Sequence, residues 1–224
     1  MTLEDALKDL RSKALPGRDL QSRAYHKIDR PYLGVANPEI NKLTASWRRR
    51  LTLDQQIGLA KGLWETNIYE ARLAAAKLLT QNRMADDAGV WTLLCSWVPD
   101  FDSWAIADHV CMAGQKRLQA DPQRLEEIAK WTTSRHMWTR RAAMVITLPL
   151  AKPKNPSADE IAAREKVLGW AASYVDDPEW FIQKSIAWWL RELSKHQSAR
   201  ARAFLEMHGA QMKNFARKEA SKYL

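Results

Sequence analysis

The sequence contains little cysteine and lacks any long uncharged run. Cys95 and Cys111 are its only cysteines, and both lie in apolar segments with helical spacing. Two isolated thiols favour free cysteines in a reducing compartment over a disulfide or a metal site. The longest uncharged run, residues 88–99, has 12 residues, whereas a membrane-spanning helix needs about 20. The opening "MTLEDALKDLRSKA" is acidic early, unlike a signal peptide, so we expect a cytoplasmic protein without a membrane span.

Glycine is also scarce, with 8 residues in 224, and no long segment alternates polar with apolar residues. Apolar residues instead recur at spacings of three and four, which predicts an all-α protein. Prolines fall between the predicted helices, and the longest irregular piece is expected at residues 149–157. Because composition does not shift along the chain, we expect one domain over residues 1–224.

Five predicted helices begin in the same way, with an aromatic residue followed by small and apolar residues. The aromatic residues are Tyr69, Trp104, Trp138, Phe181 and Phe215. They lie 35, 34, 43 and 34 residues apart, and the long interval contains the proline-rich loop. Periods of this length predict an α-solenoid of HEAT-like helical hairpins, in which neighbouring hairpins share a core. The second helix of each hairpin would then line a concave face.

Positive charge follows this repeat. The chain has 35 Lys and Arg against 26 Asp and Glu, a net charge of +9, which makes a polyanionic partner plausible. The residue three positions after the aromatic is basic in four repeats: Arg72, Arg141, Lys184 and Lys218. The second repeat instead has Ala107 followed by Asp108. A basic stripe with one carboxylate would suit a phosphate backbone and one local positive charge.

Helical geometry sorts the residues around this stripe. Trp104 and Asp108 are four residues apart and share a face. In "WFIQKSIAWWLRE", the adjacent tryptophans diverge by about 100°. Trp189 joins an apolar stripe with Ile182, Ile186 and Leu193, whereas Trp188 joins Lys184 and Arg191. We therefore expect Trp189 in the core and Trp188 on the basic face.

Simpler interpretations compete for several of these residues. Trp104 and Trp138 could pack one repeat against the next. Asp108 could be an ordinary surface acid, and Arg141 could pair with an acid of the next repeat. No Gly-rich phosphate loop occurs, and no Cys or His set has metal-ligand spacing. We therefore expect no metal and no cofactor.

Three segments carry a resemblance to a known family: "DSWAIADH" (102–109), "MWTRRAAMV" (137–145) and "WFIQKSIAWWLRELSK" (180–195). Together with "YHKIDRPYLGV" (25–35) and "FARKEASKYL" (215–224), they resemble the AlkD-like DNA alkylation repair glycosylases. The resemblance spans nearly the whole chain. It implies HEAT-like repeats with a concave basic face and excision of positively charged N3- and N7-alkylpurines from double-stranded DNA.

The resemblance also implies roles for individual residues. It places the catalytic carboxylate at Asp108, the cleft tryptophans at Trp104 and Trp188, and a DNA-contacting arginine at Arg141. Apart from the resemblance, positive charge predicts the remaining contacts with DNA phosphates at a basic set: Arg72, Arg140, Lys184, Arg191 and Lys218. Family members often carry a second acid after the first cleft tryptophan, where this chain has Ala105.

Three hypotheses follow. The first is a monofunctional DNA glycosylase that acts as a monomer, in the cytoplasm and on the nucleoid when it is bound to DNA. The second is a non-catalytic HEAT-repeat protein that binds damaged or branched DNA, because some relatives of the family do so. The third is a protein-binding scaffold, which would show no salt-dependent affinity for DNA.

Overall fold

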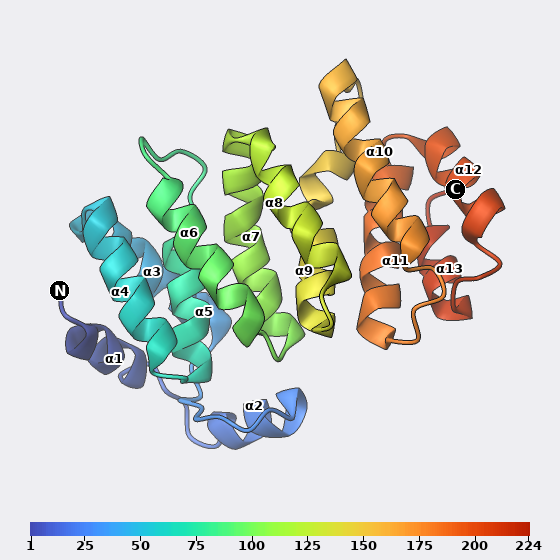
Figure 1. Cartoon of the computed structure of the whole chain (residues 1–224). Coiled ribbons are helices and arrows are strands. Elements are labelled where there is room, and N and C mark those ends of the chain that lie inside the picture. Colours follow the sequence, from blue (N-terminus) through green and yellow to red (C-terminus); the bar gives the residue numbers. More distant parts are fainter. The chain divides into compact units, whose positions relative to one another are not determined.

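The structure, a computed structural model, describes all residues 1–224 and consists of helices, turns and irregular chain (Figure 1). Its α-helices are α1 (Leu3–Arg11), α2 (Arg18–His26), α3 (Asn37–Arg50), α4 (Leu53–Glu65), α5 (Tyr69–Leu78), α6 (Ala88–Trp97), α7 (Trp104–Ala120), α8 (Leu125–Ala129), α9 (Met137–Ile146), α10 (Ala158–Ser173), α11 (Trp180–Ser194), α12 (Ser198–His208) and α13 (Asn214–Ala220). None of these helices has the length and apolar character that crossing a bilayer requires.

The chain divides into two compact units, residues 1–117 and residues 118–224. We call them the N-terminal unit and the C-terminal unit and describe each by itself. The boundary falls near the end of α7, so most of this helix belongs to the N-terminal unit. The expectation of a single domain over residues 1–224 stays a prediction.

Local sequence explains where several helices begin. Thr2, Thr52 and Ser157 each cap a helix through a side-chain oxygen that accepts a backbone N–H three residues on. Asp5, Gln55 and Glu160 return the bond to the capping residue's own N–H, which completes a capping box at α1, α4 and α10. Each box satisfies two backbone donors that a helix start would otherwise leave without partners.

In the N-terminal unit, α5 packs against α3 and α4, and small buried residues of α5 allow close contact. Glu70 of α5 is buried, and its carboxylate accepts backbone N–H bonds of 2.8 Å from Leu33, 2.8 Å from Gly34 and 3.2 Å from Val35. This bonding fixes the segment between α2 and α3. Gly34 has φ +76°, a left-handed conformation, and an added Cβ would lie 2.8 Å from the Asp19 nitrogen, so only glycine fits here.

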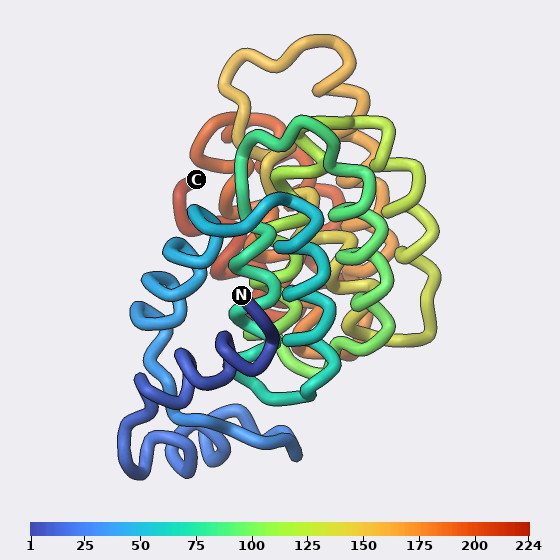
Figure 2. The backbone as a smooth tube through the Cα atoms, turned by 90° about the vertical axis from the view of Figure 1, so that its left-hand side faces the viewer, coloured from blue at the N-terminus to red at the C-terminus, as the bar shows by residue number.

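Helix α2 stands apart from the rest of the N-terminal unit (Figures 1 and 2). None of its residues is buried, and Leu20 and Tyr25 are largely exposed. The start of α2 lies close to Gly34, and aromatic contacts of Tyr25 and His26 attach its C-terminal end to the unit. This arrangement leaves α2 as a projecting element beside the start of α7.

In the C-terminal unit, α11 is the central helix and packs against α9, α12 and α13. Ile182, Ile186, Trp189 and Leu193 are all fully buried, so the predicted apolar stripe is confirmed. The Trp189 indole N–H donates to the Thr147 carbonyl at 3.3 Å, which satisfies the one polar atom of this buried ring. Trp188 is only partly buried.

The predicted repeat coincides with helix starts. Tyr69 and Trp104 are the first residues of α5 and α7, and Trp138, Phe181 and Phe215 are the second residues of α9, α11 and α13. The loop predicted at residues 149–157 is shorter than expected, because a 3-10 turn occupies Leu148–Ala151. The buried Arg164 fixes this segment, because its guanidinium donates to the carbonyls of Leu150 and Pro153 at 3.1 Å each.

Of the two cysteines, Cys111 is buried and Cys95 is half-buried. No group of three His, Cys, Asp or Glu residues is arranged to hold a metal ion.

Candidate functional site

Trp104 and Asp108 lie on the same face of α7, one turn apart, as their spacing predicts. The Trp104 side chain is 38% exposed, which is unusual for so large an apolar ring. Asp108 is half-buried. The intervening Ala105, Ile106 and Ala107 are buried and anchor the opposite face of the helix in the core. The first two turns of α7 therefore present an indole ring and a carboxylate together.

Two aromatic residues of α2 contact the Trp104 ring. His26 of α2 lies 5.7 Å away between ring centroids, and Tyr25 meets the indole edge at 6.3 Å. His26 also bonds the Tyr69 hydroxyl through Nε2 at 2.7 Å. Burial lowers the pKa of His26, so its imidazole is neutral at pH 7. A neutral, bonded histidine thus joins the aromatic starts of two repeats in the N-terminal unit.

A buried arginine supports the loop before α7. Arg30 forms an ion pair with Asp102, and the Arg30 side chain is almost completely buried. The Asp102 side chain is 42% exposed, so only one partner of the pair is fully removed from water. This contact fixes the segment that leads into Trp104. Neither residue was singled out by the sequence, because they are 72 positions apart.

Position 105 is a buried core position of α7. The Ala105 side chain is 3% exposed and packs in the core of the N-terminal unit. An acidic side chain at this position would be buried, and burying a carboxylate without a hydrogen-bonding or charged partner destabilises the fold. The first two turns of α7 in this chain therefore offer Asp108 as their carboxylate.

Three of the four basic residues of the predicted stripe lie near aromatic rings. The Arg72 guanidinium is 4.4 Å from the Trp64 ring centroid, and its Nε–H donates to the Trp64 carbonyl at 3.3 Å. Arg141 is buried in the C-terminal unit, 5.7 Å from the Trp138 centroid and 6.0 Å from that of Phe181. Lys184 lies 5.8 Å from the Trp180 centroid. These are cation–π distances, a role that sequence spacing did not predict.

Trp138 packs on the aromatic residue of the next repeat, with its ring centroid 4.6 Å from that of Phe181. Trp180 continues this row, 5.0 Å from Phe181 and 5.4 Å from Phe215. The packing interpretation of Trp138, left open by the sequence, is thereby supported. The row gives the aromatic starts of α9, α11 and α13 a packing role.

Lys184 and Arg191 share one carboxylate. Both form ion pairs with Glu219 of α13, Arg191 at 2.6 Å. Their predicted contacts with DNA phosphates would compete with this carboxylate. Lys218, one residue earlier, is exposed. The DNA-binding role of these residues stays a prediction, and Glu219 is the functional candidate that the sequence stripe missed.

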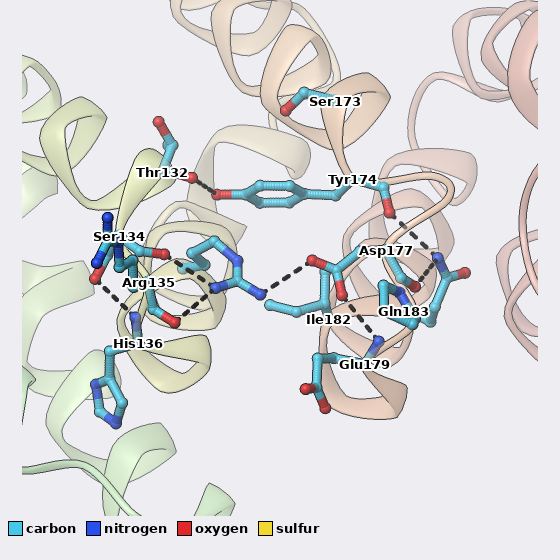
Figure 3. Close-up of polar contacts among 12 residues, drawn as sticks. Thr132, Ser134, Arg135, His136, Ser173, Tyr174, Asp177, Glu179, Ile182 and Gln183 are labelled. Atoms are coloured by element: carbon cyan, nitrogen blue, oxygen red, sulfur yellow. Dashed lines mark hydrogen bonds and ion pairs between the residues drawn. The ribbon is translucent and has the colours of Figure 1, made fainter.

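Arg140 is tied into the fold of the C-terminal unit. Its guanidinium donates to the carbonyls of Ser134 at 2.9 Å and Arg135 at 3.2 Å, and it pairs with Asp177 at 3.1 Å. Figure 3 shows Asp177 facing the 134–136 segment, with Tyr174 bonded to Thr132 beside it. With its donors used in this way, Arg140 joins α9 to the turn before α11. Its predicted contact with DNA remains to be tested.

The fold and these side chains define an all-α helical-repeat protein with aromatic and basic residues at the repeat starts. Residues 6–224 match the family of DNA alkylation repair enzymes, and the chain belongs to that family. The resemblance carried by the motifs is thereby confirmed, as is the expectation of a role in the repair of alkylated DNA. No curated protein is significantly similar in sequence.

Two solved structures show the same fold. A predicted DNA alkylation repair enzyme from Enterococcus faecalis is 20% identical, with a TM-score of 0.79 over 95% of this chain and 97% of that one. AlkD2 from Streptococcus mutans is 19% identical, with a TM-score of 0.64 over 84% of this chain and 90% of that one. At these identities the likeness speaks for the fold, and the predicted α-solenoid class is confirmed.

Proposed function

We propose that the chain is a monofunctional DNA glycosylase that excises positively charged N3- and N7-alkylpurines from double-stranded DNA. The observation that carries this proposal is the pairing of an exposed Trp104 with Asp108 on the first turns of α7. Family membership over residues 6–224 supports the repair role. On this proposal the protein acts as a monomer in the cytoplasm, on the nucleoid when bound, and without a cofactor or metal.

Hydrolysis of the N-glycosidic bond of a cationic alkylpurine needs little assistance from the protein. Alkylation at N3 or N7 makes the purine cationic, so it leaves without a strong general acid, in contrast to ordinary glycoside hydrolysis. What remains is to stabilise the oxocarbenium-like sugar and to position water. An ionised Asp108 would do both.

Trp104 would offer its π face to the developing positive charge, a contribution of about 0.5–2 kcal/mol. Trp188 is assigned the same role by the resemblance. Its partial burial, beside the fully buried Trp189, is compatible with a ring that is not a core residue. Arg141 and the exposed Lys218 are assigned to phosphates along the basic face, so affinity should fall as salt rises.

Release of 7-methylguanine from methylated duplex DNA tests the proposal. Asp108→Asn keeps the size of the side chain and removes its charge, and it should lower the rate of base release at least about 100-fold. DNA binding by the variant should persist. Equal release by wild type and Asp108→Asn would overturn the glycosylase assignment.

A second candidate function is binding to damaged or branched DNA without catalysis. The buried Ala105, where relatives often carry an acid, favours it. This alternative expects a wild-type protein that shifts branched or alkylated duplexes in a gel and releases no base. A protein-binding scaffold would show neither activity, because its affinity for DNA would be negligible.

A further inference from the structure

A basic pocket in the N-terminal unit lies outside the residues assigned above. It has a volume of about 280 Å³ and is lined by Arg48 of α3, Lys77 of α5, His109 of α7 and four uncharged residues: Asn41, Thr44, Thr80 and Met112. No aspartate or glutamate lines it. We call it the Arg48–Lys77–His109 pocket.

The cations of the pocket have no carboxylate partner. Lys77 Nζ donates to the Asn41 side-chain oxygen at 2.7 Å. Arg48 donates to two backbone carbonyls, those of Lys77 at 2.7 Å and Thr80 at 3.4 Å. Each group therefore keeps N–H donors for a ligand, and no carboxylate offsets its charge. By comparison, most partly buried charges in proteins are paired, because an unpaired one is costly.

The charges oppose one another. Burial lowers the pKa of Lys77, Arg48 and His109. A neighbouring positive charge lowers each pKa further: Arg48 acts on Lys77, Arg49 on Arg48, and Lys77 on His109. The His109 Nδ1–H donates to the Ala105 carbonyl at 2.7 Å, so its Nε2 is the atom left to gain a proton. A bound anion would relieve this repulsion.

The geometry favours a phosphate group over a planar carboxylate. Two cations, Arg48 and Lys77, and a histidine that can gain a proton at Nε2 come from three separate helices and surround one space, which suits a tetrahedral anion with oxygens pointing in several directions. We propose that the Arg48–Lys77–His109 pocket binds a phosphate group. Met112 lies one turn beyond Asp108 on the stripe of α7 that begins with Trp104, so the pocket adjoins the face on which the proposed function places DNA.

Thermal unfolding of the full chain tests the pocket itself, without reference to catalysis. Inorganic phosphate is compared with chloride and acetate at equal ionic strength and pH 7. At about ten times its Kd, phosphate should raise the Tm of the wild type by roughly 4 °C. The rise should vanish in Lys77→Met and return in Lys77→Arg. Lys61→Met, which removes an exposed lysine of α4 outside the pocket, is the matched control and should respond like the wild type.

The Tm of Lys77→Met without phosphate shows whether this variant folds normally. Without phosphate, Lys77→Met should melt no lower than the wild type, because it removes an unpaired positive charge. An equal rise in all four proteins, no rise in the wild type, or an equal effect of acetate would each overturn the proposal.

A second arm identifies the source of the phosphate. If the pocket binds the DNA backbone, Lys77→Met should reduce the slope of log K against log salt for duplex binding by about one, and Lys61→Met should not. An unchanged slope, with the response to inorganic phosphate lost, assigns the pocket to a free phosphate or a mononucleotide. The DNA source rests on the proposed function, but a failure to release bases would leave the phosphate measurements intact.

Discussion

The two units use the same repeat start in different ways. In the C-terminal unit the aromatic residues touch one another directly, from Trp138 to Phe181, Trp180 and Phe215. In the N-terminal unit the two aromatic starts, Tyr69 and Trp104, are joined through His26 of the projecting helix α2. The C-terminal row consists of direct ring contacts, whereas the N-terminal cluster is joined by a histidine that also bonds the Tyr69 hydroxyl. Both sets keep one tryptophan exposed, Trp180 in the row and Trp104 in the cluster.

Cations differ between the units in a similar way. In the C-terminal unit Lys184 and Arg191 share Glu219, and Arg140 has Asp177. In the N-terminal unit Arg48 and Lys77 bond to carbonyl and amide oxygens only. An internal carboxylate lowers the gain from binding a phosphate, since it must first be displaced. Although the N-terminal unit also contains ion pairs such as Arg30 with Asp102, its Arg48–Lys77–His109 pocket is better prepared for an anionic ligand than the cations that share Glu219. The following changes test this difference.

Replacement of the core tryptophan should have the largest effect on stability. Trp189→Ala should lower the free energy of unfolding by about 3–5 kcal/mol, because it leaves a large cavity in the C-terminal unit. Trp188→Ala is the matched variant at the next position and should cost clearly less, while weakening DNA binding or base release. Urea denaturation and a binding titration measure the two effects. Two variants that unfold alike would contradict the outward placement of Trp188.

Breaking the Arg30–Asp102 ion pair before α7 should lower the free energy of unfolding less than Trp189→Ala does. Asp102→Asn leaves the buried Arg30 without its carboxylate, and we expect a loss of about 1–2 kcal/mol, reduced from the cost of a fully buried pair because Asp102 is 42% exposed. Base release should fall as well, since this contact fixes the entry to Trp104. Asp54→Asn, at an exposed position of α4, is the control. Unchanged denaturation curves for both variants would show that the pair does not support the site.

Removal of the shared carboxylate should make the C-terminal unit more like the N-terminal one. Glu219→Gln frees Lys184 and Arg191, so duplex affinity should rise and the salt slope should steepen by up to about two. Stability should fall by roughly 1 kcal/mol, because both pairs are partly exposed. Glu206→Gln removes an exposed acid of α12 without such partners. If duplex affinity fails to rise above that of Glu206→Gln, Lys184 and Arg191 do not reach DNA.

The smallest predicted effect is a loss of stability at acidic pH. Burial lowers the pKa of both His26 and His109 below the ordinary 6.5. The unfolded chain therefore takes up protons first as the pH falls through 6.5, and the free energy of unfolding should decline on the order of 1 kcal/mol toward pH 5. Denaturation at pH 7.5 and 5.5 measures the decline. It should be smaller in a His26→Phe, His109→Gln double variant, and an equal decline would assign it to other groups.

The sequence alone predicted the helical class, the repeat starts and the separation of Trp188 from Trp189. All three depend on spacings within one helix or on a period that recurs along the chain, and helix geometry converts such spacings directly into faces. Trp104 and Asp108 share a face for the same reason, so their pairing on α7 follows from the four-residue spacing between them.

Tertiary structure alone decided which charges are free. Glu219 lies 28 positions from Arg191 and 35 from Lys184, and the pocket joins Arg48, Lys77 and His109 from three helices. Spacing along one helix carries no information about such contacts, because they depend on how separate helices pack. The same basic residue type is therefore a neutralised ion-pair partner in one unit and an unpaired pocket cation in the other, and only the fold distinguishes them.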